Sequence, residues 1–181
     1  MKLLIASDIH GSAYYCKKLV ERFEAEKADK LVLLGDILYH GPRNDLPRDY
    51  APKEVIALLS PLKDRIFCVR GNCDSEVDQM VLPFPIMADY GVILLEKCTV
   101  YATHGHKFCK ENLPPLQKGD ILLCGHTHVP EFTKTEDYIY LNCGSVSIPK
   151  ENSPHSYVIY ENGEFLWKDI NDGTTYKQEK L

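Results

Sequence analysis

Seven side chains of types that bind metal ions follow strand-like apolar runs in this sequence. They are Asp8 and His10 after KLLIAS, Asp36 after KLVLLG, Asn72 after RIFCVRG, His104 after CTVYAT, and His126 and His128 after ILLCG. In an extended chain, residues two positions apart point to the same side, so each of the pairs Asp8-x-His10 and His126-x-His128 can contact one ligand. Because the carboxyl ends of strands in an open α/β sheet meet at one edge, we expect the seven side chains to converge there.

This set of donors is too large for one tetrahedral ion. Two carboxylates, one amide oxygen and four imidazoles fit two ions that share a ligand. Nitrogen and oxygen donors without thiolate suit Mn, Fe, Zn or Co, and the net positive charge of two ions and two aspartates would attract phosphate. A single His or Asp after a strand is more often a turn former or a solvated residue. The recurrence at five strand ends favours the metal site.

Glycine stands beside a candidate ligand at each of these five strand ends. The glycines are Gly11, Gly35, Gly71, Gly105 and Gly125. We expect them to permit tight turns and close backbone approach.

The first half of the chain alternates between strand and helix patterns. Strands are expected at KLLIAS, KLVLL and RIFCVR, with helices from about Ser12 to Ala28 and from about Pro52 to Leu62. This β-α-β-α-β order predicts a largely parallel sheet with right-handed crossovers.

The second half is richer in short strands. They are expected at CTVYAT, DILLCG, YIYLNCG, SYVIY and EFLWKDI, with a hairpin turn at Asn162-Gly163. We therefore expect an α/β fold, a four-layer α/β/β/α sandwich in which helices flank two mixed sheets. Residues from about 174 to 181 are expected to form a polar tail.

Composition and charge limit the function classes. The 181 residues are 44% hydrophobic and 26% charged, which fits one domain over residues 1–181. A net charge of −5 gives no basic footprint for long nucleic acid. No apolar run approaches the ~20 residues that span a bilayer, and the N-terminal apolar stretch is too short for a signal peptide, so we expect a cytoplasmic protein with no membrane partner. Seven scattered cysteines without a C-x-x-C pair predict neither disulfides nor a thiolate zinc site.

The motifs DIHG, GD, GNCD, HGH and GHTH, in this order, resemble the calcineurin-like metallophosphoesterase superfamily. Further stretches, such as LLGDILYHGPRN and GSVSIPK, resemble its YfcE-type branch of bacterial phosphodiesterases. The resemblance implies the metallophosphoesterase fold and two divalent metal ions, usually manganese, with Fe, Zn, Ni or Co as alternatives. Carried over by position, it implies a first ion on Asp8, His10, Asp36 and His128. The second ion would be held by Asp36, Asn72, His104 and His126, so that Asp36 bridges.

The resemblance also implies roles for other residues. Cys73, Asn72 and His104 are the implied catalytic residues, and His40, Arg43, Asn44 and Cys73 the implied substrate contacts. Cys73 stands where most of the superfamily has a histidine that is assigned as proton donor to the leaving group. Cations lower the pKa of a thiol, and a thiolate cannot donate a proton. We therefore expect poor protonation of leaving groups, although Cys73 could instead only fill space.

The resulting functional prediction is a metal-dependent phosphodiesterase in which a metal-bridging hydroxide attacks a small organic phosphate diester. The alternatives are a phosphomonoesterase or nuclease of the same fold and, less favoured, a non-catalytic scaffold of that fold. The complete set of ligand-type residues disfavours the scaffold. The physiological diester, the metal used and assembly into a homo-oligomer stay open.

Overall fold

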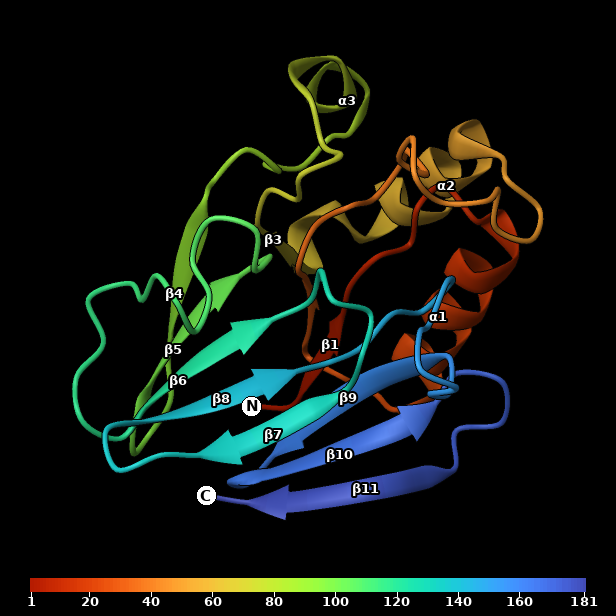
Figure 1. Cartoon of the computed structure of the whole chain (residues 1–181). Coiled ribbons are helices and arrows are strands. Elements are labelled where there is room, and N and C mark those ends of the chain that lie inside the picture. The colour runs from red at the N-terminus through yellow and green to blue at the C-terminus, as the bar shows by residue number, and fades with distance from the viewer.

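The computed structural model describes residues 1–181, which form two mixed β-sheets that pack against each other. The six-stranded sheet has the order β11-β10-β9-β1-β2-β3, and the five-stranded sheet has the order β4-β5-β6-β8-β7 (Figure 1). The strands are β1 (Leu3–Ala6), β2 (Lys30–Leu33), β3 (Ile66–Cys68), β4 (Tyr90–Leu94), β5 (Thr99–Thr103), β6 (Asp120–Cys124), β7 (Glu131–Lys134), β8 (Tyr138–Asn142), β9 (Ser156–Glu161), β10 (Glu164–Asp169) and β11 (Thr175–Lys180). The helices are α1 (Ala13–Ala25), α2 (Pro52–Leu59), the 3₁₀ helix η1 (Ser60–Arg65) and α3 (Glu76–Val81). None of them has the length and apolar composition needed to cross a bilayer.

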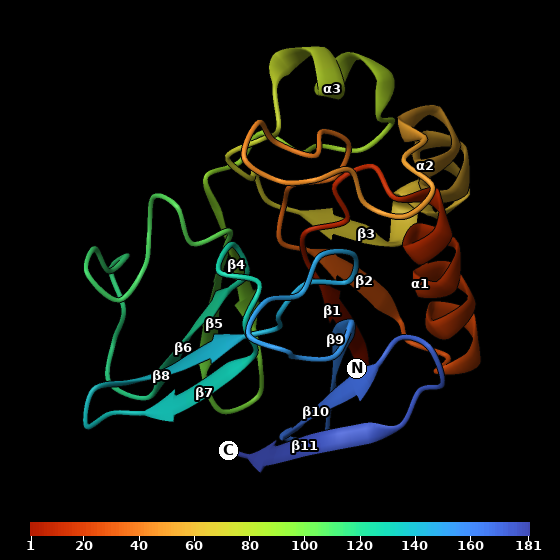
Figure 2. The same cartoon turned by 45° about the vertical axis from the view of Figure 1, so that its right-hand side comes forward.

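The predicted β-α-β-α-β unit is confirmed. Strands β1, β2 and β3 pair in parallel, and α1 and α2 connect them. Helix α1 begins where Ser12 Oγ accepts a hydrogen bond from the Tyr15 N–H, and it buries Cys16, Leu19 and Phe23 on one face. Helix α2 begins at Pro52, whose missing N–H is not needed in a first turn. Figure 2 shows both helices on the same side of the molecule.

The core lies in two layers because strands β1, β2 and β9 of the six-stranded sheet are buried on both faces. In β1, Leu4 and Ala6 pack toward the helices, whereas Leu3 and Ile5 pack into the space between the sheets. The indole of Trp167 is fully buried in the inter-sheet layer, and its N–H donates to the Asn142 carbonyl at 2.9 Å. This bond joins β10 of one sheet to β8 of the other.

The predicted α/β class with two mixed sheets is confirmed, but only one sheet carries a helical layer. The outer face of the five-stranded sheet is covered by the connection between β5 and β6, where Leu116 packs against Leu122, Cys124 and Tyr140. Pro114 and Pro115 interrupt that connection and disfavour a helix in it. Helix α3, which was not predicted, stands apart from both sheets at the top of both views (Figures 1 and 2).

The predicted hairpin at Asn162-Gly163 is confirmed: it joins β9 to β10, and both residues have positive φ, 51° and 82°. The predicted polar tail is wrong. Residues 175–180 form edge strand β11, which pairs antiparallel with β10. Most side chains of this edge strand lie in water, so its sequence does not need to alternate between apolar and polar residues. The sequence TYKQEK is therefore indistinguishable from that of a polar tail.

Candidate metal centre

The seven predicted ligand residues lie together where loops of the two sheets meet. The loops after β1 and β2 are joined by the His10 N–H, which donates to the Asp36 carbonyl at 2.8 Å. The loops after β5 and β6 are joined by the Gly125 N–H, which donates to the His104 carbonyl at 2.9 Å. The His126 N–H then donates to Asp8 Oδ2 at 3.0 Å, so the two sheets share one site at their junction.

The backbone of this site is held in an unusual conformation. Five of the seven residues have φ in the left-handed region: Asp8 (60°), His10 (49°), Asp36 (54°), His126 (67°) and His128 (63°). Asp and His tolerate this region better than most residues, but each such residue still costs of the order of 1–3 kcal/mol. The hydrogen bonds between the loops hold these conformations, which turn the side chains toward one another.

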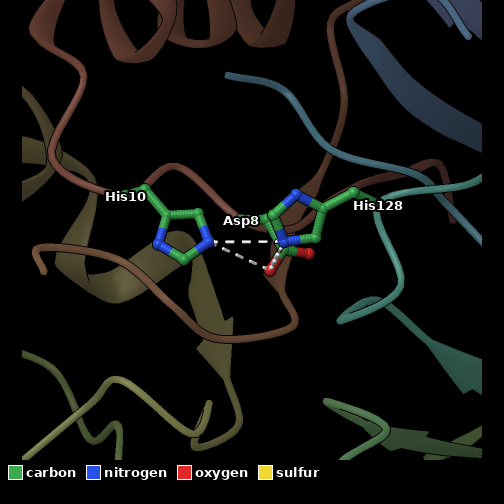
Figure 3. Close-up of side chains that lie close together, drawn as sticks. All are labelled: Asp8, His10 and His128. Carbon is green, nitrogen blue, oxygen red and sulfur yellow. Dashed lines mark hydrogen bonds and ion pairs between the residues drawn. The ribbon is translucent and has the colours of Figure 1, made fainter. Parts of the chain in front are cut away.

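The first ligand group comes from the loops after β1 and β6. Oδ1 of Asp8 lies 3.5 Å from His10 Nε2 and 3.2 Å from His128 Nε2, and the two Nε2 atoms lie 3.4 Å apart. Figure 3 shows these three side chains pointing toward a common centre. Asp36 Oδ2 is also near, 3.6 Å from His10 Nε2.

The second ligand group lies on the other side of Asp36. Asp36 Oδ2 is 3.4 Å from His104 Nε2, which is 3.0 Å from Asn72 Oδ1 and 3.1 Å from His126 Nδ1. His104 is fully buried, whereas Asn72 is exposed, so this group is open to solvent on one side.

The tautomers of three histidines indicate that these groups face a cation. The Nδ1–H groups of His10, His104 and His128 donate to backbone carbonyls of Tyr39, Leu34 and Ile148 at 2.7–2.8 Å. In the neutral rings, Nε2 therefore carries a lone pair. In the first ligand group, the Nε2 lone pair of each histidine faces the Nε2 lone pair of the other histidine and a carboxylate oxygen. Such carbonyl contacts are typical of metal-binding histidines because they fix the tautomer and the ring orientation.

The separations also fit metal coordination. Ligand atoms about 2.1 Å from an ion lie about 3.0–3.4 Å from one another in octahedral or tetrahedral geometry, and the observed contacts are close to this range. Asp8 Oδ1 is buried and has no hydrogen-bond donor, which is rare for a carboxylate unless an ion occupies that position. The residues present can therefore hold two divalent ions.

The charges in the site stabilise positive charge. Burial would raise the pKa of Asp8, but the neighbouring imidazoles of His10 and His128 hold it well below its ordinary value. Burial would lower the pKa of His104, but Asp36 and Asp8 raise it to about 9. Carboxylates that stabilise a protonated imidazole here would stabilise a bound cation in the same way.

A pocket of about 450 Å³ opens over this centre. Of the predicted substrate contacts, Arg43, Asn44 and Cys73 line it. His40 is not among the lining residues: its ring packs edge-on against Tyr39 and Tyr50. Burial first, and then the carboxylate of Asp36, raises the pKa of the Cys73 thiol, whereas cations bound beside it would lower that pKa.

Two residues at the site were not assigned a role from the sequence. The buried carboxylate of Asp74 accepts from the backbone N–H groups of Asp36, Ile37 and Gly71 at 2.7–2.9 Å, so it ties the loop after β2 to the loop after β3. The sequence feature that could have indicated this role is the position of Asp74 directly after Cys73. Lys150 lines the pocket and adds a second cation beside Arg43.

The close approach of neighbouring atoms explains why two of the five predicted positions need glycine. A Cβ on Gly71 would lie 2.1 Å from Asp36 Oδ1, and one on Gly125 would lie 2.0 Å from Ser7 Oγ. Any side chain at either position would displace a loop that carries candidate ligands.

A two-sheet α/β fold with clustered Asp, His and Asn side chains at the strand ends is the architecture of a metallophosphoesterase. Residues 1–164 match the calcineurin-like phosphoesterase superfamily domain, and the chain belongs to this superfamily, as its motifs indicated. Phosphodiesterase YfcE of Escherichia coli (strain K12) is 47% identical over 178 residues, which cover 98% of this chain and 97% of YfcE.

Solved structures agree with this assignment. The structure of YfcE, a phosphoesterase from E. coli, matches with a TM-score of 0.97 and 46% identity over 100% of both chains. Wild-type Vps29 from Entamoeba histolytica, complexed with Zn²⁺, matches with a TM-score of 0.59 and 16% identity over 100% of this chain and 98% of that one. At such low identity the second match shows the fold alone.

Proposed function

We propose that this chain is a metal-dependent phosphodiesterase that hydrolyses small organic phosphate diesters with two divalent ions. The observation that carries the proposal is the position of Asp36 Oδ2, which lies 3.6 Å from His10 Nε2 and 3.4 Å from His104 Nε2. One carboxylate oxygen thus faces both ligand groups. The choice of a diester is supported by the 47% identical E. coli relative, which is named a phosphodiesterase.

The residues that would hold the ions follow from the two groups. The first ion would be held by Asp8, His10, Asp36 and His128, and the second by Asp36, Asn72, His104 and His126. Manganese is the proposed metal, because it accepts nitrogen and oxygen donors. When bound, the two ions supply Lewis acidity, which lowers the pKa of a water and offsets charge on phosphoryl oxygens.

The side chains of the pocket would bind and orient the phosphate. Arg43 and Lys150 line it from two loops distant in sequence and supply two cations. The planar guanidinium can donate two parallel hydrogen bonds to phosphate oxygens, whereas the ammonium acts as a point charge. The Asn44 amide donates to the His40 carbonyl at 2.8 Å, which holds the turn that presents Arg43.

The same features support a small substrate and a single catalytic domain. Because the net charge is −5, only cations within the site can attract an anion. Such local attraction suits a compact phosphate diester. Both sheets contribute ligands to one centre, so we propose that residues 1–181 act as one metallophosphoesterase domain.

The proposal is tested by removing metal from the protein and measuring hydrolysis of bis(p-nitrophenyl) phosphate and p-nitrophenyl phosphate. Mn²⁺, Mg²⁺, Zn²⁺ or no ion is then added back. The expected result is turnover that depends on metal, is highest with Mn²⁺ and favours the diester. A preference for the monoester would assign the site to a phosphomonoesterase, and absence of turnover with two ions bound would favour a scaffold.

A further inference from the structure

A second, apolar pocket lies beside the candidate metal centre. It has a volume of about 410 Å³, and its apolar wall is formed by Leu38, Tyr39, Tyr50, Ile56, Val77 and Val81. These residues come from the loop after β2, from helix α2 and from helix α3. The volume is within the range of ~300–1,000 Å³ that is common for small-molecule sites.

The apolar pocket is adjacent to the phosphate pocket. Cys73 lines both, and its Sγ lies within 4.8 Å of potential ligand atoms of His10 and Asp36. Tyr39 makes a second link, because its backbone carbonyl accepts from His10 Nδ1 at 2.8 Å while its side chain lines the apolar pocket. A ligand in this pocket would therefore contact the same residues that border the metal centre.

The polar groups in the apolar pocket are already satisfied or stay in water. Asp78 Oδ2 accepts from both the N–H and the hydroxyl of Ser75 at 2.8 Å, in the capping box that begins α3. Lys53 is exposed, so its ammonium group remains hydrated. The pocket therefore offers a ligand chiefly apolar and aromatic surface.

Helix α3 presents part of this apolar surface to solvent. None of its residues is buried, and Val77 and Val81, one turn apart, are 68% and 49% exposed. Apolar side chains left exposed next to a polar catalytic pocket are typical of a binding surface.

We propose that this apolar pocket binds an apolar ester group, aromatic or alkyl, of the phosphate diester, and this inference rests on the proposed function. The substrate class is then a diester with the phosphate between the metal ligands and an organic group on Tyr39, Val77 and Val81. The occupant is a substrate group rather than a second copy of the chain, because the pocket shares Cys73 with the phosphate pocket.

The test compares two probes that differ only in the organic group. Binding of phenylphosphonate and methylphosphonate to the Mn²⁺-loaded protein is measured by calorimetry, so no turnover is needed. The test variant is the double substitution Val77→Ser and Val81→Ser, which is uncharged and nearly neutral in helix propensity. The control is Met80→Ser, on the same helix but outside the pocket lining, where Met80 is 83% exposed.

Phenylphosphonate is expected to bind the unaltered protein at least about tenfold more tightly than methylphosphonate, because it buries apolar area in the pocket. In the double variant this ratio should fall by at least about fivefold, and Met80→Ser should leave it within about twofold. An unchanged ratio in the double variant, or an equal fall in the control, would overturn the inference. So would a sedimentation shift to smaller species in both variants, which would assign α3 to contacts between copies.

The hydrolysis assay above separates this inference from the proposed function. If the unaltered protein hydrolyses the aryl diester and the double variant keeps its phenylphosphonate preference, only the pocket assignment fails. If the unaltered protein hydrolyses no diester and binds neither phosphonate, the proposed function fails and the inference fails with it.

Discussion

The backbone N–H of Cys73 donates to Oδ1 of Asp36 at 2.7 Å. This bond occupies one oxygen of the carboxylate and leaves Oδ2 to face both candidate ligand groups. The loop after β3 therefore orients the carboxylate that the loop after β2 supplies. We infer that residue 73 positions Asp36 through its backbone, whatever its side chain does.

Asp74→Asn should weaken the metal centre without removing a ligand. Asn keeps one acceptor oxygen but has an NH₂ in place of the other, so at least one of the buried N–H groups of Asp36, Ile37 and Gly71 would lose its acceptor. The expected result is a loss of about 2–4 kcal/mol in the free energy of unfolding, measured in urea. Calorimetry should also show Mn²⁺ affinity reduced by ~10–100-fold.

Asp64→Asn is the matched control for this change, because Asp64 is exposed, makes no ion pair and precedes β3, whereas the candidate ligand Asn72 follows that strand. It should alter neither stability nor metal affinity measurably. Wild-type Mn²⁺ affinity in Asp74→Asn would show that Asp74 does not orient the ligand loops.

Cys73→His should help most with poor leaving groups. A thiolate cannot donate a proton, and a thiol whose pKa is raised by burial and carboxylates is a weak acid, so Cys73 is a poor proton donor in either form. The expected gain in kcat/KM is about 10²-fold for alkyl leaving groups and little for nitrophenol, measured across a series of aryl and alkyl diesters. An equal gain throughout the series would rule out a role at the leaving group, and Cys73→Ser should give none.

Glu26→Gln should reduce stability in a pH-dependent way. Glu26 pairs with Lys168 and with Lys2, the latter at 3.1 Å, and its side chain is only 14% exposed. Burial would raise the pKa of Glu26, but the two lysines lower it below its ordinary value of 4.5. The stabilisation by Glu26 is therefore present above that pH and is lost as pH falls through the pKa of the folded state.

The expected loss for Glu26→Gln is about 1–2 kcal/mol at pH 7, measured by urea unfolding, and the difference from wild type should shrink below about pH 4. Glu24→Gln, an exposed neighbour that pairs only with Arg65, serves as the control. A difference that stays constant from pH 7 to pH 3 would contradict the assignment of the lowered pKa to Glu26.

Much of the fold was predictable because its periodicity is local. Helix α1 shows regular apolar spacing, strands β1 and β2 contain short apolar runs, and the positive φ that both Asn162 and Gly163 accept indicates the hairpin. Strands β4, β7 and β11 and helix α3 were missed because none of them contains a buried residue. The three strands lie at the edges of the sheets, and without burial the sequence carries no strong local apolar pattern.

The candidate ligands were predictable because each follows a recognisable strand end. What the sequence did not indicate is how they are held. The carbonyls of Tyr39, Leu34 and Ile148 that fix three histidines, and the N–H groups gathered by Asp74, depend on contacts between distant loops. Backbone groups are identical in every residue except proline, so a pattern of side chains does not predict which backbone groups form these hydrogen bonds.

Metal stoichiometry shows whether two ions share Asp36. Mn²⁺ bound per chain is measured by equilibrium dialysis with elemental analysis for wild type, for Asp36→Asn and for Asp89→Asn, whose exposed carboxylate pairs with Lys107. We predict two ions for wild type and Asp89→Asn, and at most one ion for Asp36→Asn at the same free Mn²⁺. Two ions bound to Asp36→Asn with unchanged affinity, or only one bound to wild type at saturation, would contradict it.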